Sequence, residues 1–171
     1  DPTGSAAIQA LNAGDVLTDT FTYTISDEPT LITGVGVEAV SSENGGFDRL
    51  AVYSINGSGL TGNQHSNGAS GVAWMANGTT ATITYDLENN YDLDKIHVWN
   101  YNEAAAGNTD RGANLVEILV SNAVGGPFTS LGDFSFAQAD GTNTYTGGAI
   151  DLSSFVAADD TRLIRFVIKS N

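Results

Sequence analysis

Short apolar runs that alternate with polar residues recur along this chain. Runs such as ATITYDL and LVEILVS are rich in β-branched and aromatic residues and are bounded by Gly, Asn or Asp, which is typical of half-buried strands. Twenty glycines and many Thr, Asn and Ser residues disfavour helices. The pattern predicts strands near residues 16–26, 32–41, 50–55, 80–87, 95–101, 114–121, 128–136 and 162–169, with a further strand around 145–152.

This many short strands, with turn signals between them, predict an all-β fold in which two sheets bury each other's apolar faces. We expect an antiparallel β-sandwich of the jelly-roll type. The longest stretch without a strand pattern lies between Ser54 and Thr80. A loop of that length is usually functional or clamped by its own side chains, and we expect Trp74 and Met75 to supply the clamp. The same loop is a candidate to carry a ligand.

Residues 1–29 are predicted to form an N-terminal strand and a linker, ahead of a sandwich domain at residues 30–171. Between Val16 and Ser26, threonines alternate with Leu17, Phe21, Tyr23 and Ile25. Pro29 then breaks the strand, as expected of a linker. The segment resembles the closing strand of the cadherin-like repeats of large bacterial surface and secreted proteins. An ordinary edge strand is the alternative interpretation.

Charge and cysteine content narrow the classes of partner. Lys and Arg number 6 against 20 Asp and Glu, so the net charge is −14 and a phosphate backbone is repelled, which excludes nucleic acid as a partner. The absence of cysteine excludes disulfides and thiolate metal sites, and it is compatible with a bacterial extracellular protein. No apolar run approaches the roughly 18 residues of a membrane helix. We expect no membrane span, and any export signal to have been removed or to lie outside this sequence.

Catalytic motifs are weak. A glycosidase needs two carboxylates that flank the glycosidic bond, and the candidates are Glu103, Asp110, Glu117 and Asp48. Sequence spacing places no pair of them at the required separation, and surface exposure is the usual state of such acids. Neither His65 nor His97 lies in a triad motif, no Gly-x-Ser-x-Gly elbow occurs, and two distant histidines do not make a zinc site. We interpret the chain as non-enzymatic.

The loop between the strands predicted at 95–101 and 114–121 is crowded with amide, acid and guanidinium groups. Arg111 lies in it with Asn100, Asn102 and Glu103, and a guanidinium fork beside amide acceptors matches the hydroxyl groups of a sugar. The alternative role for Arg111 is to pair with Glu103 or Asp110 and staple the loop. Tyr101, at the mouth of the loop, is a candidate to stack on the apolar face of a pyranose.

The two histidines have different expected roles. His65 lies in the polar run GNQHSNG, where ligand contact and plain solvent exposure are both open. His97 alternates with apolar neighbours inside a predicted strand, so we expect a structural histidine with satisfied hydrogen bonds.

From Leu31 to Asn171 the chain resembles the galactose-binding-like β-sandwich of bacterial carbohydrate-binding modules, related to the discoidin or coagulation-factor type C domains. The matching segments are ITGVGVEAVSSE, RLAVYSINGSGLTG, WMANGTTATITYDL, HVWNYNE with NTDRGANLVEILVS, and FTSLGDFSFAQADGT followed by DLSSFVAADDTRLIRFVIKSN. The resemblance implies an eight-stranded jelly roll that binds sugars through loops at one end, commonly with a structural calcium. It assigns sugar contact to His65, Asn100 to Glu103, and Arg111.

Two departures from the family affect the expected calcium. Asn56-Gly57-Ser58-Gly59 stands where relatives often have Asp-Gly-Ser-Gly, so a neutral side chain replaces a charged one. Relatives also often take a calcium ligand from a strand after the segment that ends here at Asn171. Asp48, Asn56 and backbone carbonyls are the remaining candidate calcium ligands.

Without such a closing strand a sheet edge is left open. The strand from Val16 to Ser26 is a candidate to fill that gap in its own molecule, or in a neighbour by head-to-tail strand donation. Our leading interpretation is a secreted or cell-surface bacterial module that binds a polysaccharide or glycan. The alternatives are a structural or adhesive building block that assembles through its edges, and a jelly-roll polysaccharide lyase or hydrolase.

Overall fold

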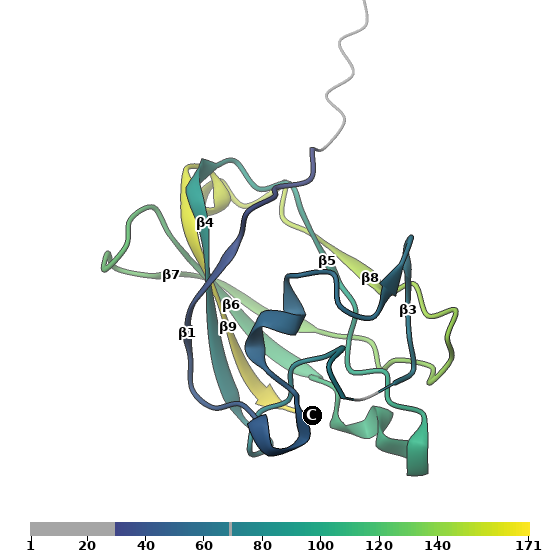
Figure 1. Cartoon of the computed structure of the whole chain (residues 1–171). Coiled ribbons are helices and arrows are strands. Elements are labelled where there is room, and N and C mark those ends of the chain that lie inside the picture. Colours follow the sequence, from purple (N-terminus) through teal and green to yellow (C-terminus); the bar gives the residue numbers. More distant parts are fainter. Residues whose placement is uncertain (1–29, 69) are drawn as a thin grey trace, which may run out of the picture.

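The computed structural model describes residues 30–68 and 70–171 (Figure 1), so the strand and linker predicted at 1–29 lie outside the described residues. Its main element is a five-stranded antiparallel sheet with the order β1-β4-β9-β6-β7. The strands are β1 (Gly36–Val40), β4 (Ala81–Tyr91), β6 (Leu115–Ser121), β7 (Thr129–Ser135) and β9 (Thr161–Ser170). Strand β9 therefore occupies the centre of the sheet, and β1 and β7 form its two edges.

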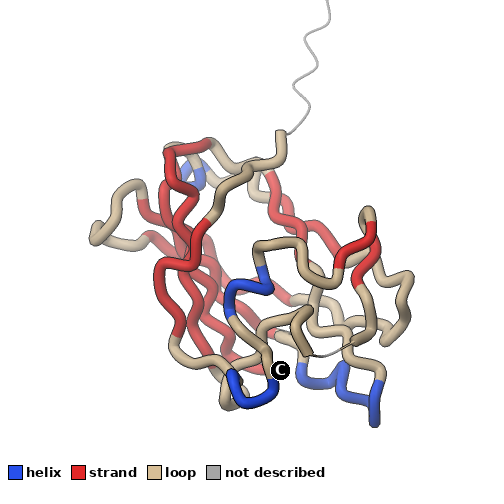
Figure 2. Tube along the Cα trace, viewed as in Figure 1, coloured by secondary structure: helices blue, strands red, loops and turns tan. Residues whose placement is uncertain are grey.

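The second layer is built from two short antiparallel pairs that face the large sheet (Figure 2). Strand β2 (Leu60–Thr61) pairs with β3 (Gln64–His65), and β5 (Lys95–Val98) pairs with β8 (Gly148–Asp151). An isolated bridge joins His65 of β3 to Tyr145, which precedes β8 in the chain. The two pairs thus lie in one layer, and the all-β antiparallel sandwich predicted from the sequence is confirmed.

The core lies between the layers because the strands of the large sheet direct every second side chain inward. Each of the three middle strands contributes two or more buried aliphatic or aromatic side chains, namely Ile83, Leu87, Val116, Ile118, Val120, Ile164 and Phe166. Trp74 packs against this core, and its indole N–H donates to the carbonyl of Ser42 over 3.1 Å. Trp74 therefore clamps the long loop, as expected of it.

In the described part of the chain, helical structure is confined to short 3₁₀ segments, which are η2 (Gly45–Phe47), η3 (Ala51–Ser54), η4 (Ala105–Arg111) and η5 (Val156–Ala158). Among residues 30–68 and 70–171, no helix is long and apolar enough to cross a membrane.

The strand predicted at 50–55 is wrong, because this segment forms η3. The Glu43 carboxylate accepts a hydrogen bond from the N–H of Ala51 over 2.8 Å, and the Ser54 hydroxyl donates to the carbonyl of Ala51 over 2.6 Å. These local partners satisfy the backbone without a neighbouring strand. The other predicted strands that lie within the described residues are present, including the one near 145–152, which is β8.

Candidate functional site

Three loops meet at one end of the sandwich, and Asn102 lies between them with 1% of its surface exposed. Its side-chain N–H groups donate to the carbonyls of His65 and Ser66 over 3.2 Å each and to that of Thr142 over 2.7 Å. Its side-chain oxygen accepts from the N–H of Gly141 over 2.9 Å. We call the loops joined in this way, residues 63–68, 99–112 and 137–145, the loop platform.

Asn100 fixes the platform from below in a similar way. Its side-chain N–H groups donate to the carbonyls of Ala113 and Ala137 over 2.7 and 2.9 Å, and its oxygen accepts from the N–H groups of Tyr101 and Ala113 over 2.9 Å each. A Cβ atom on Gly112 would lie 2.8 Å from the same oxygen, so only glycine fits beside it. The loop carrying η4 is therefore held in one position against the sheet.

A charged cluster lies on the platform and joins Arg49, Tyr101, Glu103 and Arg111. Glu103 accepts a hydrogen bond from the Tyr101 hydroxyl over 2.7 Å, and the guanidinium groups of Arg49 and Arg111 lie 3.4 and 3.6 Å from the same carboxylate oxygen. Arg49 also donates to the Tyr101 hydroxyl. One carboxylate thus holds two cations, and the cluster carries one net positive charge on a chain of net charge −14.

The members of the cluster differ in their access to solvent. Arg49 and Tyr101 are each 7% exposed, whereas 45% of the Arg111 side chain is exposed. The distance of 3.6 Å between Arg111 and Glu103 is longer than a hydrogen bond, so the pair is electrostatic and leaves guanidinium donors available to solvent. Arg111 is therefore the member of the cluster best placed to meet a ligand.

The cluster shifts the pKa values of its acids in opposite directions. Burial opposes the charged form of Glu103, but hydrogen bonds from Tyr101 and Asn108 and the charges of the two arginines outweigh burial and lower the pKa of Glu103. Burial, reinforced by the hydrogen bond to Glu103, raises the pKa of Tyr101 to about 12. At neutral pH the cluster is thus a carboxylate beside a neutral phenol.

His65 and His97 are both engaged by backbone carbonyl groups. The two ring nitrogens of His65, which is 6% exposed, lie 2.8 Å from the carbonyl oxygen of Ser66 and 3.1 Å from that of Val72. The His97 ring lies 2.8 Å from the carbonyl oxygen of Thr146 and packs against Trp99 at a centroid distance of 4.2 Å, with the two ring planes tilted by 46°. One ring nitrogen of His97 therefore has a backbone partner, which is compatible with the structural role predicted for this residue.

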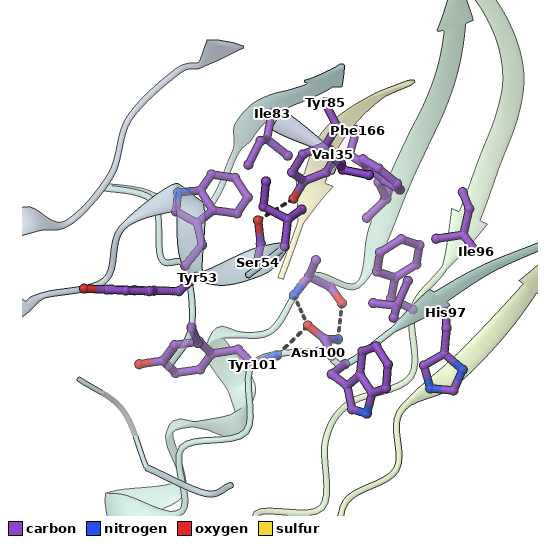
Figure 3. A pocket seen from close by; sticks show the side chains of 18 of the residues that line it. Val35, Tyr53, Ser54, Ile83, Tyr85, Ile96, His97, Asn100, Tyr101 and Phe166 are labelled. Carbon is purple, nitrogen blue, oxygen red and sulfur yellow. Dashed lines mark hydrogen bonds between the residues drawn. The ribbon is translucent and has the colours of Figure 1, made fainter. Parts of the chain in front are cut away.

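A cavity of about 760 Å³ lies between the two layers and reaches the platform. Figure 3 looks into it, with Tyr53 on one side and Ile96 and His97 of β5 on the other. The inner face of β4 lines it along its length, and Tyr101 and Arg111 line it at the platform end. Its walls are mostly aliphatic and aromatic, so the cavity itself is suited to apolar groups.

The residues predicted as sugar contacts are brought together, but with different exposure. Asn100, Tyr101, Asn102 and His65 are buried, and the described loops occupy the amides of both asparagines. On the same platform Arg111 is exposed, whereas only 12% of the Glu103 side chain is exposed. The pairing of Arg111 with Glu103, which the sequence left open beside a ligand role, is present.

The candidate calcium ligands Asp48 and Asn56 have local partners of their own. The Asp48 carboxylate accepts hydrogen bonds from the hydroxyls of Tyr53 and Ser70 over 2.7 and 3.4 Å, and the Asn56 oxygen accepts from the N–H of Ser58 over 2.9 Å. In the described part of the chain, no three His, Asp or Glu side chains gather to hold a metal. These residues do not form a calcium site by themselves, so calcium binding stays a prediction.

Arg49 is a member of the cluster that sequence reasoning missed. It lies at the start of the run RLAVYS, which alternates like a strand and drew attention to its apolar residues instead. Its Nε is buried and has no hydrogen-bond partner among the described residues. The chain has only four arginines, and this scarcity of cations was the signal that could have drawn attention to Arg49.

No protein-family profile and no curated protein sequence matches this chain. Among solved structures, it is similar to a fragment of a putative chitobiase from Bacteroides thetaiotaomicron, with 17% identity, a TM-score of 0.57, and 85% of this chain and 84% of the other covered. It is similar to the lectin domain of lectinolysin complexed with Lewis B antigen, with 16% identity, a TM-score of 0.54, and coverage of 81% and 84%. It is also similar to a chain in the crystal structure of reduced XRCC1 bound to the DNA polymerase β catalytic domain, with 17% identity, a TM-score of 0.51, and coverage of 79% and 83%. At these identities the likeness establishes that the chain shares the β-sandwich fold of these domains.

Proposed function

We propose that this chain is a non-catalytic carbohydrate-binding module of a secreted or surface-attached bacterial protein, and that it binds a polysaccharide or glycan through the loop platform. Arg111 is the principal contact. Its guanidinium group donates hydrogen bonds to sugar hydroxyls, and Glu103 accepts a hydrogen bond from a neighbouring hydroxyl.

The observation that carries this proposal is the state of Arg111. Its side chain is 45% exposed, is held beside Glu103 at 3.6 Å, and stands on loops that Asn100 and Asn102 fix from within. A donor that is already positioned loses little conformational entropy on binding, which favours recognition of a polar ligand.

The other predicted contact residues hold the site in position and do not touch the ligand themselves. Asn100 and Asn102 hold the loops, Tyr101 orients the Glu103 carboxylate, and His65 anchors the loop that faces them. Their burial leaves direct contact chiefly to the exposed Arg111, with the half-buried Glu103 and Asn108 beside it.

The similar folds are compatible with this function, since they include a chitobiase fragment and a lectin domain in complex with Lewis B antigen. Hydrolysis is disfavoured by the electrostatics of the cluster. A glycosidase acid needs a raised pKa in order to stay protonated, whereas two arginines and two hydrogen bonds lower the pKa of Glu103.

The test is glycan-array binding followed by calorimetric titration of the best ligand, with the unmodified chain and Arg111→Ala. Loss of a charged hydrogen bond costs about 1.5–3 kcal/mol, so we expect affinity to fall roughly 10- to 100-fold. Arg111→Lys keeps the charge without the planar fork and is expected to bind at an intermediate strength.

Lys169→Ala is the matched control, because it removes a cation of similar exposure whose partners Glu117 and Asp133 lie on strands β6 and β7. This variant should bind as well as the unmodified chain. Full-strength binding by a folded Arg111→Ala variant would show that the proposed contact is wrong, and an array without any glycan bound would refute carbohydrate recognition.

A further inference from the structure

The cavity between the layers runs along the sandwich from the loop platform toward its other end. Alternate residues of β4 line it from Ala81 to Leu87, a distance of about 20 Å. Ala81 pairs near the end of β9, whose Ser170 accepts a hydrogen bond from the N–H of Asn114 over 2.9 Å. Asn114 follows Arg111 by three residues, so the Ala81 end of the cavity is the platform end.

The aromatic side chains that line the cavity present mainly carbon to it, because their polar atoms bond elsewhere in the protein. The hydroxyls of Tyr53 and Tyr85 donate to side-chain oxygens over 2.7 and 2.8 Å. The indole N–H groups of Trp74 and Trp99 donate to backbone carbonyls over 3.1 and 3.2 Å. A sugar ring in the cavity would lose its water without gaining hydrogen bonds from these four groups. The cavity is therefore suited to a hydrocarbon group.

The character of the wall changes at the platform end, where Arg111 lines the cavity. The side chain of Arg111 is 45% exposed, so the same residue also faces solvent on the platform. Tyr101, which is 7% exposed, lines the cavity as well. A sugar that contacts Arg111 thus has the cavity directly beside it, and the polar surface and the apolar cavity are continuous at this residue.

We propose, on the basis of the carbohydrate-binding function proposed above, that the glycan carries an alkyl or acyl substituent. The sugar contacts Arg111, and the substituent enters the cavity and runs along β4 toward Leu87. The volume of about 760 Å³ lies within the range of about 300–1,000 Å³ that is usual for ligand pockets. The ligand is a soluble acylated glycan and not a membrane lipid, because a chain of net charge −14 is repelled by the anionic surface of a membrane.

The first test compares the methyl and decyl glycosides of the sugar that the glycan array selects. Calorimetric titrations are made below the concentration at which the decyl glycoside forms micelles. We expect the affinity to rise by up to about fourfold for each methylene group that the cavity buries. Equal affinity of the two glycosides overturns the acylated ligand and leaves carbohydrate binding intact. An array without any bound glycan refutes both.

Two variants with a similar change in side chain locate the bound chain. Ile96→Phe adds a ring to the cavity wall, whereas Leu119→Phe adds one to the outer face of the large sheet, since Leu119 alternates with the buried Ile118 and Val120. We expect Ile96→Phe to lower the affinity for the decyl glycoside roughly tenfold and to leave that for the methyl glycoside unchanged. Leu119→Phe should change neither. Unchanged decyl glycoside affinity in folded Ile96→Phe contradicts the proposed location.

Arg111→Ala tests whether the sugar and the chain belong to one ligand. The two glycosides share the sugar, so this variant should lower both affinities by the same factor. A decyl glycoside that keeps its full affinity for Arg111→Ala would occupy the cavity apart from the sugar site, and this result overturns the proposal.

Fluorescence of the unmodified chain gives a readout that needs no variant to fold. The chain has two tryptophans, Trp74 and Trp99, and both line the cavity. Trp99 belongs to the platform, and Trp74 donates to Ser42 near the start of β4. A bromobutyl glycoside of the selected sugar should therefore quench them by contact with bromine, and the butyl glycoside should not.

The same titration separates other occupants of the cavity. A cavity that is filled by protein, from this chain or from a second copy, gives no quenching at saturation and overturns the proposal. Binding to phosphatidylcholine vesicles that carry a glycolipid of the same sugar, without binding of the soluble decyl glycoside, assigns a membrane lipid instead and overturns the soluble ligand.

Discussion

Replacing Asn102 with alanine removes a side chain that ties three loops of the platform to one another. The amide has two hydrogens for three carbonyl groups, so His65 and Ser66, at 3.2 Å each, share one hydrogen, and Thr142, at 2.7 Å, receives the other. The side-chain oxygen serves Gly141. Asn102 therefore supplies three hydrogen-bond equivalents at a position with 1% exposure.

The expected loss of stability follows from those three bonds. Each contributes about 1 kcal/mol, and the buried groups left behind find no replacement partner unless water enters the space, so the free energy of unfolding should fall by about 3 kcal/mol. In a domain of this size that corresponds to a decrease in Tm of about 6–12 °C. Asn90→Ala is the control, because its amide also joins distant backbone groups, Asn122 and Asp160, but lies exposed to solvent. We expect a loss below about 1 kcal/mol there.

Urea unfolding monitored by tryptophan fluorescence measures both losses, with an unchanged m-value as the condition for comparing midpoints. Hydrogen exchange adds a local readout, since the N–H of Gly141 should exchange faster in Asn102→Ala than in Asn90→Ala. A loss below about 1 kcal/mol for Asn102→Ala would refute the view that this amide organises the platform.

Three further outcomes follow from other parts of the structure. Gly147→Ala should destabilise the fold by several kcal/mol, because φ is +71° and the new Cβ would lie 2.4 Å from the carbonyl oxygen of Val98; a midpoint in urea equal to that of the unmodified chain would contradict this. Tyr85 and Tyr101 should form tyrosinate only near pH 12, because the fold raises the pKa of each to about 12. The stability that the two neutral phenols contribute is therefore lost between about pH 10 and 12. In an ultraviolet absorbance titration, replacing each tyrosine with Phe should remove its tyrosinate signal near pH 12. If calcium binds as the sequence predicts, a calcium chelator should lower Tm, because an ion that binds only the folded chain stabilises it; an unchanged Tm would contradict that prediction.

The period-two pattern correctly predicted the strands of the large sheet. It wrongly predicted a strand where η3 forms. In β4 and β9 the alternation reflects a real inner and outer face, so sequence and structure agree. The run at 50–55 alternates equally well, but the carboxylate of Glu43 satisfies the backbone of Ala51 locally. This hydrogen bond to a residue eight positions earlier in the chain favours η3 over a strand. The alternation of apolar and polar residues carries no information about such a bond.

The composition of the loop from Asn100 to Arg111 identified it as a candidate site. It did not predict that several of its side chains are buried. Polar residues in a loop indicate surface contacts, which is why Asn100 and Asn102 were predicted to touch a ligand. Their amides instead bind backbone groups 13 to 40 residues away in the chain, including Ala113 and Thr142. That role depends on which loops converge, and a single sequence does not reveal convergence.

The central place of β9 has a consequence for the order in which the protein can assemble. Before Thr161–Ser170 is synthesised, the pair β1 with β4 and the pair β6 with β7 can each form, but nothing joins them. About seventy residues separate the end of β4 from the start of β9, which the ribosome needs roughly 4–14 s to add. The edge of β4 that later pairs with β9 stays open during that interval, and the edge of β6 is open from the completion of β7 at Ser135. The nascent chain therefore exposes adhesive strand edges until the late segment β9 joins both halves.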